Sequence, residues 1–122
     1  MTRIVLVVDD SPTDTQNLKN LLEKAGYQVV VAHSGAEAIT KVKAEKPDMV
    51  IMDVVMPGVN GFQATRMISK DPETCNIPII VVSSKNQETD RMWALRQGAK
   101  DYVMKPVVEA ELLDKVKAAL VH

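Results

Sequence analysis

Short apolar runs recur along the chain and alternate with stretches in which apolar residues return at helical spacing. The runs at 4–8, 27–32, 49–53 and 77–82 are mostly apolar and rich in Val and Ile. Such runs predict strands that are buried on both faces, as in a parallel sheet covered by helices. The run at 100–104 is more polar and alternates in character, which predicts a strand at the edge of the sheet.

The stretches between these runs predict helices, because start and stop signals bracket the periodic segments. Ser11 is the expected N-cap of the first helix, and Gly26 follows its end. Ser34 and Glu37 predict a capping box that opens the second helix, and Pro47 closes it. The first, third, fourth and fifth helices are expected at about residues 12–25, 61–70, 87–97 and 109–121. Pro12 stands at the first helical position of the first helix, and Asn60 caps the third.

Five alternating strand and helix units predict one α/β domain over residues 1–122, with a parallel sheet, right-handed crossovers and helices on both faces. No separate output domain is expected. In such doubly wound sheets, ligands bind outside the carboxyl ends of the strands. The residues that close or directly follow a predicted strand should therefore share one site: Asp9, Asp10, Asp53, Ser83 and Lys105.

Three carboxylates at one sheet edge resist ionising together, because two charges about 4 Å apart repel by on the order of 4 kcal/mol at an effective dielectric of about 20. A divalent cation relieves this repulsion, and oxygen ligands with open water positions suit Mg²⁺, which also binds phosphate oxygens. Lys105 and the Ser83 hydroxyl favour a phosphate, and Asp53 can act as a nucleophile toward phosphorus. The residues therefore predict Mg²⁺-dependent phosphoryl transfer onto Asp53.

Composition narrows the partners and the compartment. The 122 residues carry a formal net charge of −1 with basic and acidic residues interspersed, which disfavours nucleic acid as a partner. The first strand begins almost at Met1, and no apolar run approaches the length of a membrane span, so neither a signal peptide nor membrane insertion is expected. Cys75 is the only cysteine, which fits a reducing compartment. We expect a cytoplasmic protein.

Four motifs at the predicted strand ends resemble those of a known family. They are Val-Val-Asp9-Asp10-Ser, Ile-Met-Asp53-Val-Val-Met-Pro57-Gly, Val-Val-Ser83-Ser and Tyr102-Val-Met-Lys105-Pro106. In this order and at this spacing they resemble the receiver domain of two-component response regulators, over the whole chain. The resemblance implies a flavodoxin-like, doubly wound sheet of five parallel strands in the order 2-1-3-4-5.

The resemblance also implies a phosphoacceptor and a set of metal ligands. Asp53 would accept a phosphoryl group from a histidine kinase. Asp10 would bind Mg²⁺ directly, and Asp9 would help through water. The backbone carbonyl of Val55 would be a further metal ligand.

The same resemblance implies a switch that is coupled to the phosphoryl group. Ser83 would swing toward that group, Lys105 would contact it, and Tyr102 would change rotamer. The Lys105–Pro106 peptide bond resembles the cis bond of the family. Phosphorylation would then bias a two-state equilibrium at a face made by the fourth helix, the fifth strand and the fifth helix, where partners bind.

Within receivers, the stretches at 56–66 and 86–98, with Trp93, resemble the stand-alone regulators of type IV pilus twitching motility. This narrower resemblance implies a chemotaxis-type histidine kinase and an unknown downstream protein in the pilus motor or its regulatory machinery. Val55 and Lys85 occupy the two positions that tune dephosphorylation in the family. Neither is a carboxylate or an amide that could position water, so we expect slow self-dephosphorylation.

An active relay is not the only function that these residues allow. A phosphate sink, or a constitutive docking module of the same fold with weak switching, stays open. An aspartate-nucleophile phosphatase is disfavoured because Val55 stands where its general acid would be. A flavin-binding protein is disfavoured because Asp9 and Asp10 would repel the flavin phosphate. Trp93 and Met92 fit either a partner-binding patch or core packing.

Overall fold

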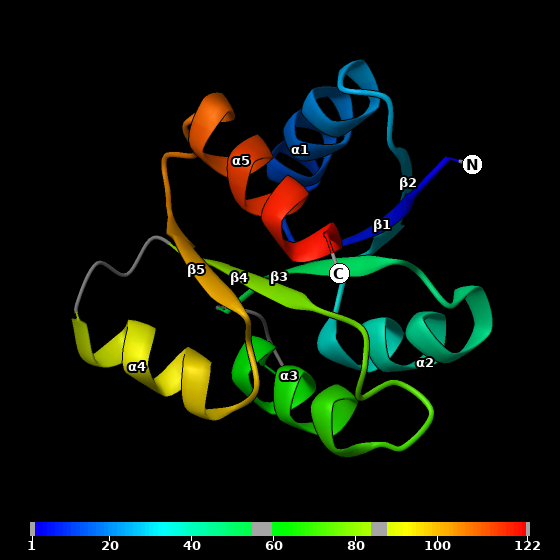
Figure 1. The fold of residues 1–122 in the computed structure, drawn as a ribbon, viewed down its shortest axis with the longest axis vertical. Helices are drawn as coiled ribbons and strands as arrows, with labels where there is room; N and C mark the ends of the chain where they lie inside the picture. Colours follow the sequence, from blue (N-terminus) through cyan, green and yellow to red (C-terminus); the bar gives the residue numbers. More distant parts are fainter. Residues whose placement is uncertain (1, 55–59, 84–87, 122) are drawn as a thin grey trace.

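The computed structural model describes residues 2–54, 60–83 and 88–121 and contains one sheet of five parallel strands. The strands lie in the order β2-β1-β3-β4-β5, which confirms the predicted α/β fold and strand order. Each strand is followed by a helix, as Figure 1 shows. The elements are β1 (Ile4–Val8), α1 (Pro12–Lys24), β2 (Gln28–Ala32), α2 (Gly35–Glu45), β3 (Met49–Asp53), α3 (Gly61–Lys70), β4 (Ile79–Ser83), α4 (Glu88–Arg96), β5 (Asp101–Met104) and α5 (Glu109–Leu120).

Helices cover both faces of the sheet, so its central strands are buried on both sides. In β1, Val5 and Val7 pack into the core under α1 and α5, while Leu6 and Val8 pack into the core under α2, α3 and α4. Alternate residues of one strand thus enter opposite cores, which explains the nearly continuous apolar runs in the sequence. The more polar β5 lies at one edge of the sheet, as its composition predicts.

The helix starts follow the sequence signals, with one exception. Ser11 caps α1, and Asn60 caps α3 in a complete capping box with Gln63. The capping box predicted for α2 is wrong in one half. The Ser34 hydroxyl accepts the Glu37 N–H at 3.1 Å, but the Glu37 carboxylate accepts the N–H of His33 at 2.8 Å. The Glu37 side chain therefore reaches one residue beyond the N-cap.

Three strands begin later than their predicted runs, including β5, which begins at Asp101 rather than at residue 100. Tyr27 is not part of β2, because its N–H donates to the carbonyl of Leu22 and closes the end of α1. β4 begins at Ile79 rather than at residue 77, since Pro78 has no N–H and contributes only its carbonyl, which accepts from Val50. The ends of α1, α4 and α5 each fall one residue short of the predicted ranges.

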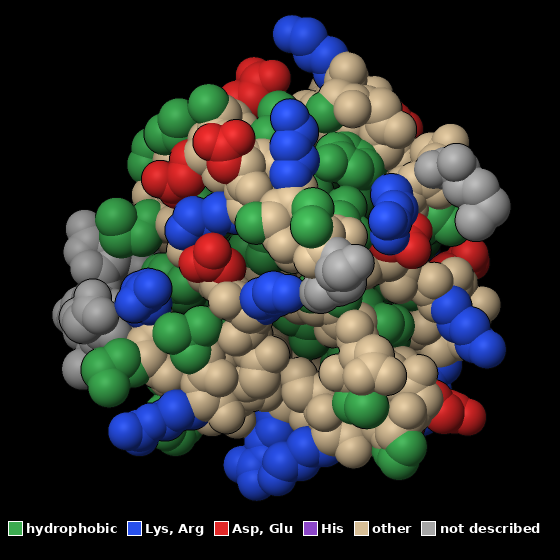
Figure 2. All heavy atoms as spheres, in the orientation of Figure 1, with side chains coloured by type: hydrophobic (Ala, Val, Ile, Leu, Met, Phe, Trp, Pro, Cys, Tyr) green, Lys and Arg blue, Asp and Glu red, His purple; other side chains and the backbone are tan. Residues whose placement is uncertain are grey.

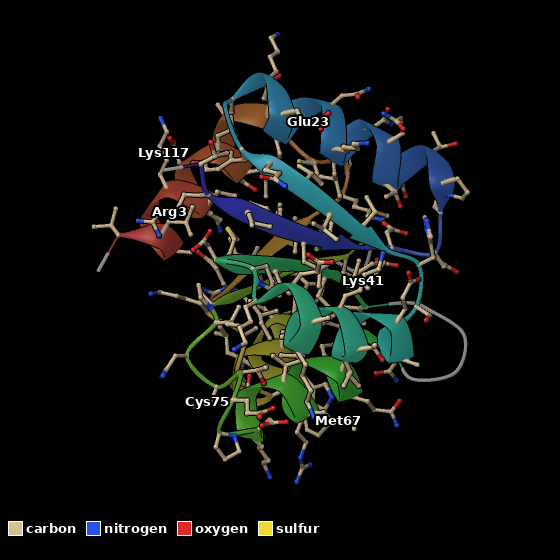
Figure 3. The ribbon with its side chains drawn as sticks, turned by 90° about the vertical axis from the view of Figure 1, so that its right-hand side faces the viewer. Arg3, Glu23, Lys41, Met67, Cys75 and Lys117 are labelled. Carbon is tan, nitrogen blue, oxygen red and sulfur yellow. The ribbon has the colours of Figure 1, made fainter. Side chains whose placement is uncertain are left out.

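The surface carries charges of both signs. Lys, Arg, Asp and Glu side chains share the face shown in Figure 2, with hydrophobic side chains between them. Figure 3 shows the same molecule after a quarter turn, with the sheet running between its two helical layers and Met67 on the outer surface of α3. Among the residues that the structure describes, no helix is both long and apolar enough to cross a membrane.

Candidate phosphoryl-transfer site

The carboxyl ends of β1 and β3 bring three carboxylates together. Val8 pairs with Met52 across the two strands, so Asp9 and Asp53 follow at neighbouring positions. One oxygen of each of Asp9, Asp10 and Asp53 lies within 4.8 Å of the others. The Asp9 and Asp53 residues are only 1% and 6% exposed, whereas Asp10 is exposed. Two of the three charges are thus largely removed from water, and burying an unpaired carboxylate costs free energy.

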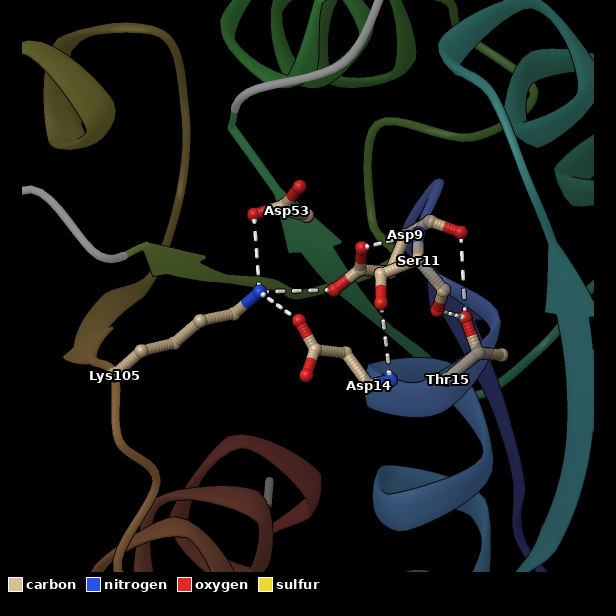
Figure 4. A network of polar contacts seen from close by, with 6 residues as sticks. All are labelled: Asp9, Ser11, Asp14, Thr15, Asp53 and Lys105. Atoms are coloured by element: carbon tan, nitrogen blue, oxygen red, sulfur yellow. Dashed lines mark hydrogen bonds and ion pairs between the residues drawn. The ribbon is translucent and has the colours of Figure 1, made fainter.

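Lys105 supplies the cation that pairs with these carboxylates. It directly follows β5, and its backbone N–H donates to the carbonyl of Ser83 at 2.7 Å, which ties it to the end of β4. Its Nζ lies 3.0 Å from Asp9 Oδ2 and 3.5 Å from Asp53 Oδ1 (Figure 4). The structure therefore brings together four of the predicted site residues, Asp9, Asp10, Asp53 and Lys105.

Asp14 is a further member of this cluster that the sequence analysis missed. Its Oδ2 accepts a hydrogen bond from Lys105 Nζ at 3.0 Å, from the first turn of α1 (Figure 4). In the sequence, an acidic residue at this place is explained by the helix dipole alone. The available signal was its position, one turn into the helix that leaves the carboxyl end of β1, on the same edge as Lys105.

The loop after β1 holds Asp9 in place. Asp9 Oδ1 accepts the N–H of Ser11 at 2.9 Å, and the backbone carbonyl of Asp9 accepts the hydroxyl of Thr15 at 3.3 Å. Thr15 also donates to the carbonyl of Ser11 at 2.7 Å. These bonds link the carboxylate, the N-cap and the first turn of α1, so the acidic cluster is preorganised by the fold.

The environment perturbs both Asp53 and Lys105. Burial, aided by the negative charge of Asp9, raises the pKa of Asp53 to about 6, although Lys105 opposes this rise. Burial lowers the pKa of Lys105, but its hydrogen bonds to Asp9 and Asp14 outweigh burial and the pKa is raised overall. Lys105 therefore stays protonated, while the pKa of about 6 means that Asp53 loses its proton around pH 6.

The donor set fits a hard divalent cation. The three clustered carboxylates offer oxygen ligands only, and Asp10 keeps one side of the cluster open to water. Mg²⁺ binds through one or two carboxylates and retains several waters. Asp9, Asp10 and Asp53 are therefore the residues that could hold Mg²⁺, and the surplus of negative charge around Lys105 would favour it.

The other predicted site residues have different settings. Ser83 is the last residue of β4 and is fully buried, and Tyr102 of β5 is 6% exposed and packs into the core under α4. The Lys105–Pro106 peptide bond is cis, as the family resemblance implies. Val55 and Lys85 lie outside the described residues.

Trp93 is 50% exposed, so its interpretation as a core residue is wrong. The same holds for Met92, which is 48% exposed.

Gly61 contributes to the site through close packing that the sequence analysis did not detect. It begins α3, and its N–H donates to the carbonyl of Val54 at 3.0 Å. A Cβ at this position would lie 2.0 Å from the backbone oxygen of Asp53 and 2.7 Å from the Cα of Val54. Only glycine lets α3 start directly against the end of β3, where Asp53 stands.

Comparison with known proteins agrees with this geometry. Residues 5–117 match the family model of the response regulator receiver domain. The chain is 53% identical to protein PilH of Pseudomonas aeruginosa over 95% of this chain and 96% of PilH. Among solved structures, chemotaxis protein CheY4 of Vibrio cholerae superposes with a TM-score of 0.92 at 28% identity, covering 98% of this chain and 100% of CheY4.

A second structural neighbour contains the ligands that the site chemistry suggests. It is a complex of CheX and CheY with BeF3 and Mg²⁺ from Borrelia burgdorferi. The TM-score is 0.92 at 28% identity, over 98% of this chain and 90% of that chain.

Proposed function

We propose that this chain, which belongs to the family of response regulator receiver domains, accepts a phosphoryl group on Asp53 from a histidine kinase. The observation that carries the proposal is the setting of the Asp53 carboxylate at the end of β3. It is buried, it lies within 4.8 Å of Asp9 and Asp10, and it is 3.5 Å from the Lys105 ammonium group. A buried carboxylate with a cation beside it and a metal-binding donor set around it suits nucleophilic attack on phosphorus.

In the transfer step, an oxygen of Asp53 forms a bond to phosphorus while the bond from phosphorus to the donor's histidine nitrogen breaks. The electron pair of the broken bond stays on that nitrogen. Asp53 must be ionised to attack, and its pKa of about 6 leaves it ionised above that pH. Lys105 stays charged and offsets the charge on the phosphoryl oxygens, and the Ser83 hydroxyl donates a hydrogen bond to one of them.

Mg²⁺ is the proposed cofactor, with Asp9, Asp10, Asp53 and the backbone carbonyl of Val55 as its protein ligands. When bound, it neutralises negative charge on the transferred phosphoryl group. Without it, the buried carboxylates and the incoming phosphate would repel one another. The protein catalyses only its own phosphorylation and dephosphorylation, so it is not an enzyme that turns over a separate substrate.

The proposed output is a change at the face made by α4, β5 and α5, coupled to Ser83 and Tyr102. That face carries exposed apolar side chains that a protein partner could cover, at Met92, Trp93, Met104 and Val108. The 53% identity to PilH supports the narrower proposal of a stand-alone cytoplasmic regulator in twitching or related motility, served by a chemotaxis-type kinase. Its downstream partner would belong to the pilus motor or its regulatory machinery.

The test is intact-mass measurement after incubation with a small phosphodonor such as acetyl phosphate. We expect the native protein to gain one phosphoryl group only when Mg²⁺ is present. Asp53→Asn should gain none. Asp114→Asn, an exposed position on α5, is the matched control and should behave as the native protein does. A folded native protein that binds Mg²⁺ but gains no phosphoryl group would overturn the proposal.

A further inference from the structure

Asp14 contacts the site from the first turn of α1, where its carboxylate is not the N-cap of the helix. The N-cap is Ser11, whose hydroxyl accepts the backbone N–H of Asp14 at 3.3 Å. The Asp14 side chain turns instead toward Lys105, as Figure 4 shows, and accepts its ammonium group at 3.0 Å. The Asp14 carboxylate therefore pairs with the cation of the acidic cluster, Lys105.

The three acceptors do not share Lys105 equally. Its Nζ lies 3.0 Å from both Asp9 Oδ2 and Asp14 Oδ2, but 3.5 Å from Asp53 Oδ1. Both of the closer acceptors belong to the segment that runs from the end of β1 into α1. The ammonium group is thus drawn toward α1 and away from the carboxylate that would carry a phosphoryl group.

A cation bound by the acidic cluster would leave Asp14 as the main competitor for Lys105. Asp9 belongs to the cluster of three carboxylates that could ligate a metal ion, and Asp14 does not. A metal ion on Asp9 would weaken the hold of that residue on Lys105. Asp14 would keep its contact, because it is not one of the candidate metal ligands among the described residues.

We propose that Asp14 is a positioning residue that holds Lys105 toward α1 and thereby lowers the affinity of the site for a phosphoryl group on Asp53. This inference rests on the proposed function. The Asp14 side chain is 44% exposed and that of Lys105 is 21% exposed, and pairs with such exposure have modest strength. Releasing Lys105 should therefore raise the affinity for a phosphoryl mimic by about two- to fivefold.

Substitution at Asp14 should leave the fold intact. Asp14 and Lys105 both line a hollow of about 540 Å³ between α1 and the segment that follows β5, together with Leu18, Leu21 and Pro106. Asn has nearly the shape of Asp, and the side chain at this position is 44% exposed to solvent. Asp14→Asn consequently removes the charge without a steric penalty.

The experiment measures binding of beryllofluoride, a phosphoryl mimic, to the Mg²⁺-saturated protein by isothermal titration calorimetry. Asp14→Asn should bind about two- to fivefold more tightly than the native protein. Asp14→Glu keeps a carboxylate at this position and should bind beryllofluoride within about twofold of the native protein. Glu23→Gln is the matched control, because Glu23 lies near the other end of α1 (Figure 3), and it should bind as the native protein does.

A double-mutant cycle with Lys105→Met separates positioning from simple charge repulsion. If Asp14 acts through Lys105, Asp14→Asn has no effect on affinity once Lys105 is replaced. An equal gain in both backgrounds would overturn the proposal, as would an unchanged or weaker affinity of Asp14→Asn alone. Failure of the native protein to bind beryllofluoride would instead refute the proposed function.

A second readout needs no metal or phosphoryl mimic. In the metal-free protein, the NMR signal of the Lys105 ε-methylene group should shift in Asp14→Asn and stay in place in Glu23→Gln. An unshifted signal in Asp14→Asn would show that Asp14 does not hold the ammonium group in solution, and would also overturn the proposal.

Discussion

Replacing Asp53 by Asn should make the metal-free protein more stable at neutral pH. The carboxylate is buried and faces the charge of Asp9, and together these raise its pKa from 3.8 to about 6. A raised pKa means that the folded state binds the proton of Asp53 more tightly than the unfolded state does. The contribution of this group to stability is therefore fully present below pH 3.8 and is lost as the pH rises through about 6.

The size of the effect follows from the two pKa values. Their difference of about 2.2 corresponds to about 3 kcal/mol at about 1.36 kcal/mol per pH unit. Asn has nearly the same volume, and its amide oxygen can still accept a hydrogen bond from Lys105. We therefore expect Asp53→Asn to raise the free energy of unfolding by as much as about 3 kcal/mol at about pH 7.5, and by only about 0.5 kcal/mol near pH 4.

Urea unfolding of both proteins at the two pH values, without divalent metal, measures this difference. Comparison at equal pH cancels the titration of every other group that the substitution leaves alone. Asp114→Asn, at an exposed position, should stay within about 0.5 kcal/mol of the native protein at both pH values. A variant at Asp53 that is no more stable at neutral pH, or that gains the same amount near pH 4, would refute the electrostatic explanation.

Three further substitutions test single features of the site. Lys105→Met removes the cation 3.0 Å from the buried Asp9 and should cost about 3 kcal/mol without metal; melts with saturating Mg²⁺ should recover most of this, and equal losses in both conditions would contradict it. Gly61→Ala places a Cβ 2.0 Å from the Asp53 backbone oxygen and should cost about 3 kcal/mol or more in urea unfolding; a native-like midpoint would show that the contact relaxes freely. Asn60→Ala removes the cap of α3 and should cost about 1 kcal/mol in thermal melts followed by circular dichroism, and an unchanged melt would argue against the cap.

The sheet could be predicted because the composition of each strand reflects how deeply the strand is buried. β1 and β3 are buried on both faces, so almost every residue in them must be apolar. Their carboxyl ends could be placed together because parallel strands that are joined by helices all point the same way. This polarity places Asp9 and Asp53 at the same sheet edge, and the strand order that the family resemblance implies makes β1 and β3 neighbours.

The contact between Asp14 and Lys105 could not be predicted in the same way. The two residues are 91 positions apart in the sequence, and their distance depends on how α1 and the segment after β5 pack on one face. The first-turn position of Asp14 had a sufficient local explanation in the helix dipole. Local rules identify which residues can cap or end an element, but they do not say which side chains meet across the sheet edge.

The error at the start of α2 has a local cause, whereas the position of Trp93 depends on the whole fold. Glu37 bonds to His33 rather than to its N-cap, which a sequence pattern for capping boxes does not distinguish. Trp93 lies on α4, where the spacing of apolar residues did not separate a core position from a surface position. Its exposure depends on the packing angle of α4 against the sheet, which is a property of the whole fold.

The most direct test of the central claim is to locate the phosphoryl group on the chain. Borohydride reduces an aspartyl phosphate to homoserine, which tandem mass spectrometry identifies within a proteolytic peptide. After treatment with a small phosphodonor and Mg²⁺, the account predicts homoserine at position 53 and at no other aspartate. Homoserine at position 9 or 10, or undiminished phosphorylation of Asp53→Asn, would contradict it.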